Sequence, residues 1–137
     1  LRIQSFPVKS QKEIPKALQQ VSKDADVLWG IVDDTVYNSQ TAKFIIQDTV
    51  RRYRIPFIGI SASYVKAGAL YALVFDNRDI GRQSAELANR ILGATPVAEL
   101  QSTTPEKIRL ALNLRTAELI GIEIPEKIIK KASTVYE

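Results

Sequence analysis

The sequence of 137 residues contains no cysteine and no histidine. The absence of cysteine excludes disulfides, thiolate metal sites and cysteine nucleophiles. The absence of histidine excludes Ser-His-Asp triads, histidine-ligated zinc and histidine proton shuttles. An enzyme is therefore the least expected class, and the sequence predicts no cofactor, no catalytic residues and no metal ligands.

Long apolar runs are also missing, because none approaches the roughly 20 residues that span a bilayer. Apolar residues make up 45% of the chain and charged residues 25%, as in ordinary globular domains. This length supports one α/β unit with a core but is short for two complete domains. Because a strand pattern already begins at Leu1, we expect the chain to be cut from a longer protein.

The net charge of +4 comes from scattered basic residues, and the densest run is Arg51-Arg52-Tyr53-Arg54. Positive charge is typical of a helix C-terminus, where it meets the negative end of the helix dipole. Since no nucleic-acid-binding motif accompanies this run, nucleic acid is not an expected partner.

The first 60 residues predict an alternation of strands and helices. Residues 1–6 alternate apolar and polar, as a half-buried strand does. A capping box over 10–13 opens a helix through about residue 21, with Ile14, Leu18 and Val21 on one face. Residues 26–32 and 55–60 are almost wholly apolar, which is typical of strands covered on both faces, so Trp29 is expected in the core. A helix over 39–53 joins these two strands. The spacing is that of right-handed crossovers in a parallel sheet.

The second half continues in the same style. A strand over 69–75 leads to Asp76, which is expected to cap a long helix through Leu92 that Gly93 closes. The inward face of this helix is predicted to be Ile80, Ser84, Leu87, Ala88 and Ile91. After a loop-like stretch, residues 107–113 predict a strand, Asn113 caps a short helix that ends at Gly121, and a last helix starts at Pro125.

Parallel sheets bind ligands outside the carboxyl ends of their strands. This rule points to the loop of Asp33, Asp34 and Thr35, and to the loop from Ser61 to Tyr64.

Several segments in register resemble one family. They are Asp26 to Trp29 leading to Asp33-Asp34-Thr35-Val36, Ile55 to Ile58, Val65 to Leu70, Asp76 to Gly81, Ala88 to Gly93, Leu112 to Ala117 and Leu119 to Pro125. Together they are similar to the ABC transporter substrate-binding family that includes tryptophan- and tyrosine-type receptors.

The resemblance implies a type I periplasmic-binding-protein fold, with an α/β class and a three-layer α/β/α lobe around a parallel sheet. Residues 1–67 would belong to the second lobe. Residues 68–96 would cross into the first lobe as a strand and a helix, and residues 97–137 would return to the second.

The resemblance also implies a set of ligand-binding residues: Asp33, Asp34, Thr35, Ser61, Ser63, Tyr64 and Asp76. Three positions depart from the family pattern. Asp34 stands where asparagine is usual, and the extra acid favours a cationic or zwitterionic ligand. Ala62 replaces a frequent acid, and Asn77 replaces a frequent aromatic residue. The alternative at each cluster is helix capping, by one of the two aspartates, by the loop from Ser61, or by Asp76.

The expected function is therefore the extracytoplasmic solute receptor of an ABC importer, binding an amino acid or similar zwitterion between two lobes and docking on a membrane permease. The protein would lie in the periplasm or outside the cell, free or as a lipid-anchored lipoprotein. The alternative is a ligand-sensing domain of a signalling protein, with a repressor core of the same fold as a third option. In this truncated form, the exposed crossover segment predicts a homodimer, exchange of that segment between chains, or packing of the segment back on the second lobe.

Overall fold

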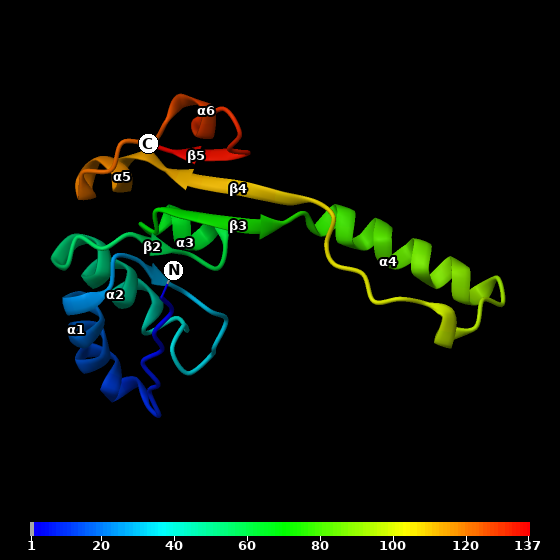
Figure 1. Ribbon diagram of the computed structural model, residues 1–137, viewed down its shortest axis with the longest axis horizontal. Helices are drawn as coiled ribbons and strands as arrows, with labels where there is room; N and C mark the ends of the chain where they lie inside the picture. The colour runs from blue at the N-terminus through cyan, green and yellow to red at the C-terminus, as the bar shows by residue number, and fades with distance from the viewer. Residues whose placement is uncertain (1) are drawn as a thin grey trace. The chain divides into compact units, whose positions relative to one another are not determined.

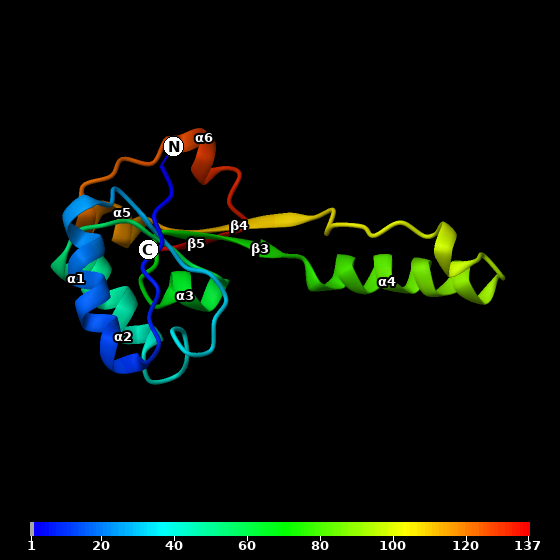
Figure 2. The same ribbon diagram turned by 60° about the horizontal axis from the view of Figure 1, so that its bottom comes forward.

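The computed structural model describes residues 2–137 and contains one five-stranded sheet in the order β1-β2-β3-β4-β5 (Figure 1). The strands are β1 (Leu28–Trp29), β2 (Phe57–Ile58), β3 (Tyr71–Phe75), β4 (Ile108–Asn113) and β5 (Thr134–Tyr136). The pairs β1–β2, β2–β3 and β4–β5 are parallel, whereas the arrows of β3 and β4 run in opposite directions in Figure 1. Helices flank the sheet, and Figure 2 shows α3 and α6 on opposite sides of it. The predicted α/β class with a mostly parallel sheet is confirmed.

The chain divides into two compact units. The first unit comprises the residues up to Leu73 together with Leu110–Glu137, and the second unit is Val74–Arg109. Both boundaries fall within strands. In the described residues, no helix is long and apolar enough to cross a membrane.

The core of the first unit is formed by helices that bury one face each. The helix α1 (Ile14–Asp24) buries Ile14, Leu18 and Val21, which recur at the helical period, as predicted. Next come α2 (Ala42–Gln47), the π-helical turn η2 (Asp48–Arg52) and α3 (Ala62–Lys66). The ring of Phe57 on β2 is fully buried.

The C-terminal part of the first unit largely follows the sequence prediction. The side chain of Asn113 accepts a hydrogen bond from the N–H of Thr116 at 2.8 Å and so caps α5 (Leu114–Ile120). Gly121 ends this helix with a φ of 76°, a conformation that glycine adopts without a steric cost. The helix α6 (Glu126–Ile129) follows Pro125. The sequence analysis did not predict the strand β5.

In the second unit, α4 (Asn77–Leu92) is capped by Asp76, as predicted, and a 3-10 turn η3 (Val97–Glu99) follows. Gly93 ends α4, as predicted. Its φ is −80°, and the positive φ of 65° belongs to the next residue, Ala94. The predicted inward face of α4 is not buried, and Asp79 is the buried residue of this helix. An apolar face stays exposed when no second layer covers it.

The predictions for the N-terminal segment and for the first apolar run were wrong. Residues 2–8 form no strand, and Leu1 lies outside the described residues. The run from Asp26 to Val32 gives a strand of two residues, in which Trp29 is 61% exposed. Both differences arise because β1 is an edge strand that pairs with β2 alone. Residues 2–8 therefore form no strand beside β1, and Trp29 is not covered.

Two helix starts also differ from the prediction. Residues 10–13 form a 3-10 turn, η1 (Gln11–Glu13), in which the Glu13 carboxylate accepts from the N–H of Lys9 at 3.0 Å rather than closing a capping box with Ser10. The second helix begins at Ala42, not Ser39, because Asn38 accepts hydrogen bonds from the N–H groups of Gln40 and Thr41 and holds a turn there.

Candidate functional site

The loop of residues 33–35, the Asp33 loop, follows β1 at the edge where parallel strands offer their carboxyl ends. Oδ1 of Asp33 accepts hydrogen bonds from the N–H groups of Thr35 at 2.8 Å and Val36 at 2.9 Å. Asp33 therefore shapes the turn, but it does not cap a helix, because α2 begins only at Ala42. Among the described residues, no hydrogen bond engages the exposed carboxylate of Asp34. All three side chains of this loop are exposed, and only that of Asp33 is hydrogen-bonded within the loop.

The loop of residues 61–64, the Ser61 loop, follows β2 and opens α3. The Oγ atoms of Ser61 and Ser63 are 2.7 Å apart and share a hydrogen bond. Gly59 allows this turn, because a Cβ at that position would lie 2.9 Å from Cβ of Tyr64. The structure therefore brings Ser61, Ser63 and Tyr64 together.

Tyr37 connects the two loops. Its ring meets the ring of Tyr64 edge-on, with centroids 6.0 Å apart, and its N–H donates to the carbonyl of Asp33 at 2.7 Å. Burial, helped by the charges of Tyr64 and Asp33, raises the pKa of Tyr37 to about 12, so its hydroxyl stays neutral at ordinary pH. Burial also raises the pKa of Tyr64. The sequence analysis missed Tyr37, because no local pattern indicates its contact with Tyr64.

Asp76, the remaining predicted site residue, belongs to the second unit. Its Oδ1 accepts from the N–H groups of Arg78 at 3.1 Å and Asp79 at 3.3 Å, and its Oδ2 accepts from Nε of Arg109 at 3.0 Å. Nη2 of Arg109 donates to the same oxygen. The bond from Arg109 is the main reason that the pKa of Asp76 lies below its ordinary value. Asp76 is therefore both a helix cap and half of an ion pair.

Two cavities of the first unit are lined by described residues. The larger, of about 810 Å³, lies between residues 2–8 and the helix α1, and Asp33, Tyr37 and Trp29 belong to its wall. It marks the space that the unpaired N-terminal segment leaves beside β1.

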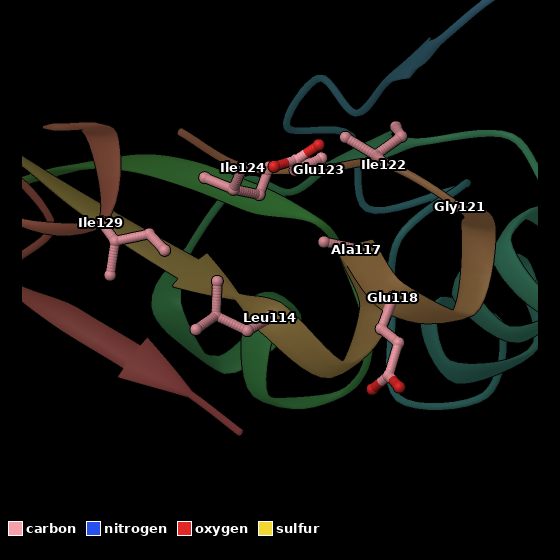
Figure 3. A pocket seen from close by; sticks show the side chains of 8 residues that line it. All are labelled: Leu114, Ala117, Glu118, Gly121, Ile122, Glu123, Ile124 and Ile129. Atoms are coloured by element: carbon pink, nitrogen blue, oxygen red, sulfur yellow. The ribbon is translucent and has the colours of Figure 1, made fainter. Parts of the chain in front are cut away.

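The smaller cavity, of about 420 Å³, lies between α5 and the segment that follows it (Figure 3). Leu114, Ile124 and Ile129 make its wall apolar, and none of the predicted site residues lines it. In the described part of the chain, no group of three or more acidic side chains is placed to hold a metal ion.

The whole chain matches one protein family. The family model described as ABC transporter substrate binding protein matches residues 1–136. The chain therefore belongs to the ABC transporter substrate-binding protein family, and the predicted family is confirmed. A search of curated proteins gave no match.

Solved structures agree on the fold. A conserved domain protein from Vibrio cholerae O1 biovar El Tor is 27% identical, with a TM-score of 0.69, over 93% of this chain and 42% of that one. An ABC domain in complex with L-Trp from Streptococcus pneumoniae is 22% identical, with a TM-score of 0.74, over 98% of this chain and 45% of that one. A ligand-free, open substrate-binding protein with adhesive properties from Clostridium difficile is 19% identical, with a TM-score of 0.70, over 94% of this chain and 42% of that one. The chain thus spans less than half of the length of each of these structures.

Proposed function

We propose that this chain supplies half of the ligand cleft of an extracytoplasmic solute receptor that serves an ABC importer. The observation that carries the proposal is the family match over residues 1–136, joined to two polar loops at the carboxyl ends of adjacent parallel strands. Ligands of open α/β sheets bind at this edge.

We infer that the whole receptor has two lobes. Residues 1–67 and 97–137 belong to one lobe, and residues 68–96 contribute a strand and a helix to the other. The match to less than half of each solved structure supports this division, because it leaves room for the greater part of the first lobe.

The ligand class proposed is an amino acid or a similar small zwitterion. The free carboxylate of Asp34 suits an ammonium group, and Thr35 adds a hydroxyl donor and acceptor. The hydroxyls of Ser61 and Ser63 suit a carboxylate, and Tyr64 suits a flat side chain. Asp33 contributes to the site by shaping its loop. The L-Trp bound to the Streptococcus pneumoniae protein of similar fold supports this class.

The mechanism is binding rather than catalysis. A ligand that contacts both lobes has a higher affinity for the closed form and shifts the hinge equilibrium toward it. The closed receptor then docks on a membrane permease. Substrate-binding proteins of ABC transporters are extracytoplasmic, so the receptor works in the periplasm or on the outer surface of the cell, free or lipid-anchored.

The isolated chain has a further proposed property. The apolar side chains Ile91 and Leu92 of α4 are 44% and 84% exposed, and such faces favour association. We expect the isolated chain to form a homodimer or to exchange this segment between chains. Light scattering during gel filtration measures this directly, and a monodisperse monomer would count against it.

A thermal-shift screen of the standard amino acids on the full-length protein tests the ligand class. At least one is expected to raise the melting temperature, because a ligand that binds only the folded state stabilises it. Asp34→Asn keeps the shape of the side chain and removes its charge, so it should reduce this stabilisation; an unchanged shift would remove Asp34 from the site. If no amino acid stabilises the full-length protein, the proposed ligand class is wrong.

A further inference from the structure

In the ion pair of the second unit, both carboxylate oxygens of Asp76 are fully hydrogen-bonded, whereas the guanidinium of Arg109 still has free donors. Each carboxylate oxygen of Asp76 already accepts two donors, from two backbone N–H groups at Oδ1 and from Arg109 at Oδ2. The side chain of Asp76 is 11% exposed, whereas that of Arg109 is 58% exposed. A ligand ammonium would have to displace one of these donors before it could bind Asp76.

The guanidinium of Arg109 has one unused edge. A guanidinium presents donors along two edges, one formed by Nε and Nη2 and the other by Nη1 and Nη2. Asp76 occupies the first edge, since both Nε and Nη2 donate to its Oδ2. Among residues 2–137, no hydrogen bond engages Nη1 of Arg109. The second edge fits a carboxylate, which binds arginine through two parallel hydrogen bonds.

Three of the other four acids of the second unit are paired elsewhere, and the fourth, Glu99, forms no ion pair among the described residues. Asp79 bonds Arg82 at 3.1 Å and Lys107 at 3.3 Å. Glu86 and Glu106 bond Arg82 at 2.7 Å and 2.8 Å. Asp76 is therefore the one acid paired with Arg109 in the described residues, and the open edge of Arg109 has no acid of this unit as a second partner.

We propose that Arg109 binds the carboxylate of the ligand and that Asp76 is a positioning residue that orients the guanidinium. This inference rests on the proposed function, because it assumes that Asp76 and its neighbours face the ligand. It reverses the role expected from sequence, in which Asp76 itself receives the ligand. In this proposal the second unit recognises the carboxylate of the ligand.

The test uses the full-length protein and isothermal titration calorimetry. Each standard amino acid that binds is compared with its decarboxylated amine and its amide, such as tryptamine and L-tryptophanamide for L-tryptophan. We expect the amino acid to bind at least about 10-fold more tightly than either analogue, and Arg109→Gln to weaken amino-acid binding about 10- to 100-fold while leaving the amine nearly unchanged.

Three variants sharpen the test. Arg109→Lys keeps the charge but loses the planar donor edge, so it should restore only part of the affinity. Asp76→Asn should weaken binding in the wild-type background but have little further effect beside Arg109→Gln, which a merely structural role would not produce. The control Lys107→Gln removes a neighbouring exposed cation and should bind like the wild type.

The outcomes separate the two proposals. If the protein binds amino acids and Arg109→Gln binds them equally well, or if amines bind as tightly as amino acids, the role of Arg109 is wrong and the receptor function stands. If no amino acid binds the wild type, the proposed ligand class fails and the role of Arg109 fails with it.

Discussion

The side-chain amide of Asn113 donates from Nδ2 to the carbonyl of Val65 at 2.8 Å, across 48 residues of sequence. The same side chain caps α5 through its Oδ1. A second bond, from Oγ1 of Thr116 to the carbonyl of Gly68 at 3.0 Å, lies beside it. These two buried residues therefore fix α3, and with it the Ser61 loop, to the junction of β4 and α5.

Replacing Asn113 by alanine should destabilise the protein by about 2–4 kcal/mol. The change removes a helix cap and leaves the carbonyl of Val65 buried without its donor. Urea unfolding measures the loss. Asn113→Ser, which can cap α5 but is too short to reach Val65, should lose about half as much. A loss below about 0.5 kcal/mol for the alanine variant would show that this side chain does not hold α3.

Thr49 carries a hydroxyl that should be dispensable. Its side chain is 1% exposed, and Oγ1 has no hydrogen-bond partner among the described residues. Thr49→Val should leave the free energy of unfolding unchanged or raise it by up to about 1 kcal/mol, because the valine has no polar atom to desolvate. The matched control is Thr116→Val, which loses the bond to Gly68 and should cost about 1 kcal/mol. Equal losses in the two variants would contradict this account.

Replacing glycine by alanine is expected to have opposite effects on stability at positions 59 and 81. A Cβ at position 59 would lie 2.9 Å from Cβ of Tyr64 and 3.1 Å from Cβ of Ala69, whereas one at position 81 would meet nothing within 4 Å. Gly59→Ala should destabilise the protein by about 1–3 kcal/mol and weaken ligand binding, because the Ser61 loop must shift. Gly81→Ala, inside α4, should stabilise by about 0.5–1 kcal/mol. Thermal unfolding of both variants checks the pair, and similar effects would be evidence against the close approach at Gly59.

Asp76 should make stability depend on pH in the acidic range. The hydrogen bond from Arg109 lowers the pKa of Asp76 below its ordinary value of 3.8, so the folded state favours the charged form. This contribution is present above the ordinary pKa and is lost as the pH falls through the lowered one.

The measurement for Asp76 is the unfolding free energy of the wild type and Asp76→Asn as a function of pH. The wild type should be more stable by a constant amount above about pH 5, and the gap should close as the pH falls below about 4. In an Arg109→Gln background the pH-dependent part should shrink, since its main cause is removed. A gap that stays constant down to about pH 2.5 would rule out the lowered pKa.

Local signals in the sequence predicted much of this fold. The caps at Asp76 and Asn113, the stop at Gly121 and the apolar face of α1 each depend on neighbours within a few residues, so the sequence alone reveals them. The family resemblance and the mostly parallel sheet rest on many such elements in register.

The features that were missed depend on partners far away in sequence. Arg109 and Asp76 form their ion pair although 33 positions separate them in the sequence, and no short-range pattern indicates that pair. Trp29 lies in an apolar run that is typical of a buried strand, but burial requires a neighbour on both faces, and β1 is at the edge of the sheet. Tyr37 gains its role only when Tyr64 packs against it.

The most direct test of the receptor function is titration calorimetry of the full-length protein with the amino acid that stabilises it most. The account predicts saturable binding of one ligand per chain, weakened by Tyr64→Ala and at least about 10-fold weaker for the chain of residues 1–137 alone, because half of the cleft is then missing. Absence of binding by the full-length protein, or equal affinity for the isolated chain, would contradict the proposal that this chain contributes half of an interlobe site.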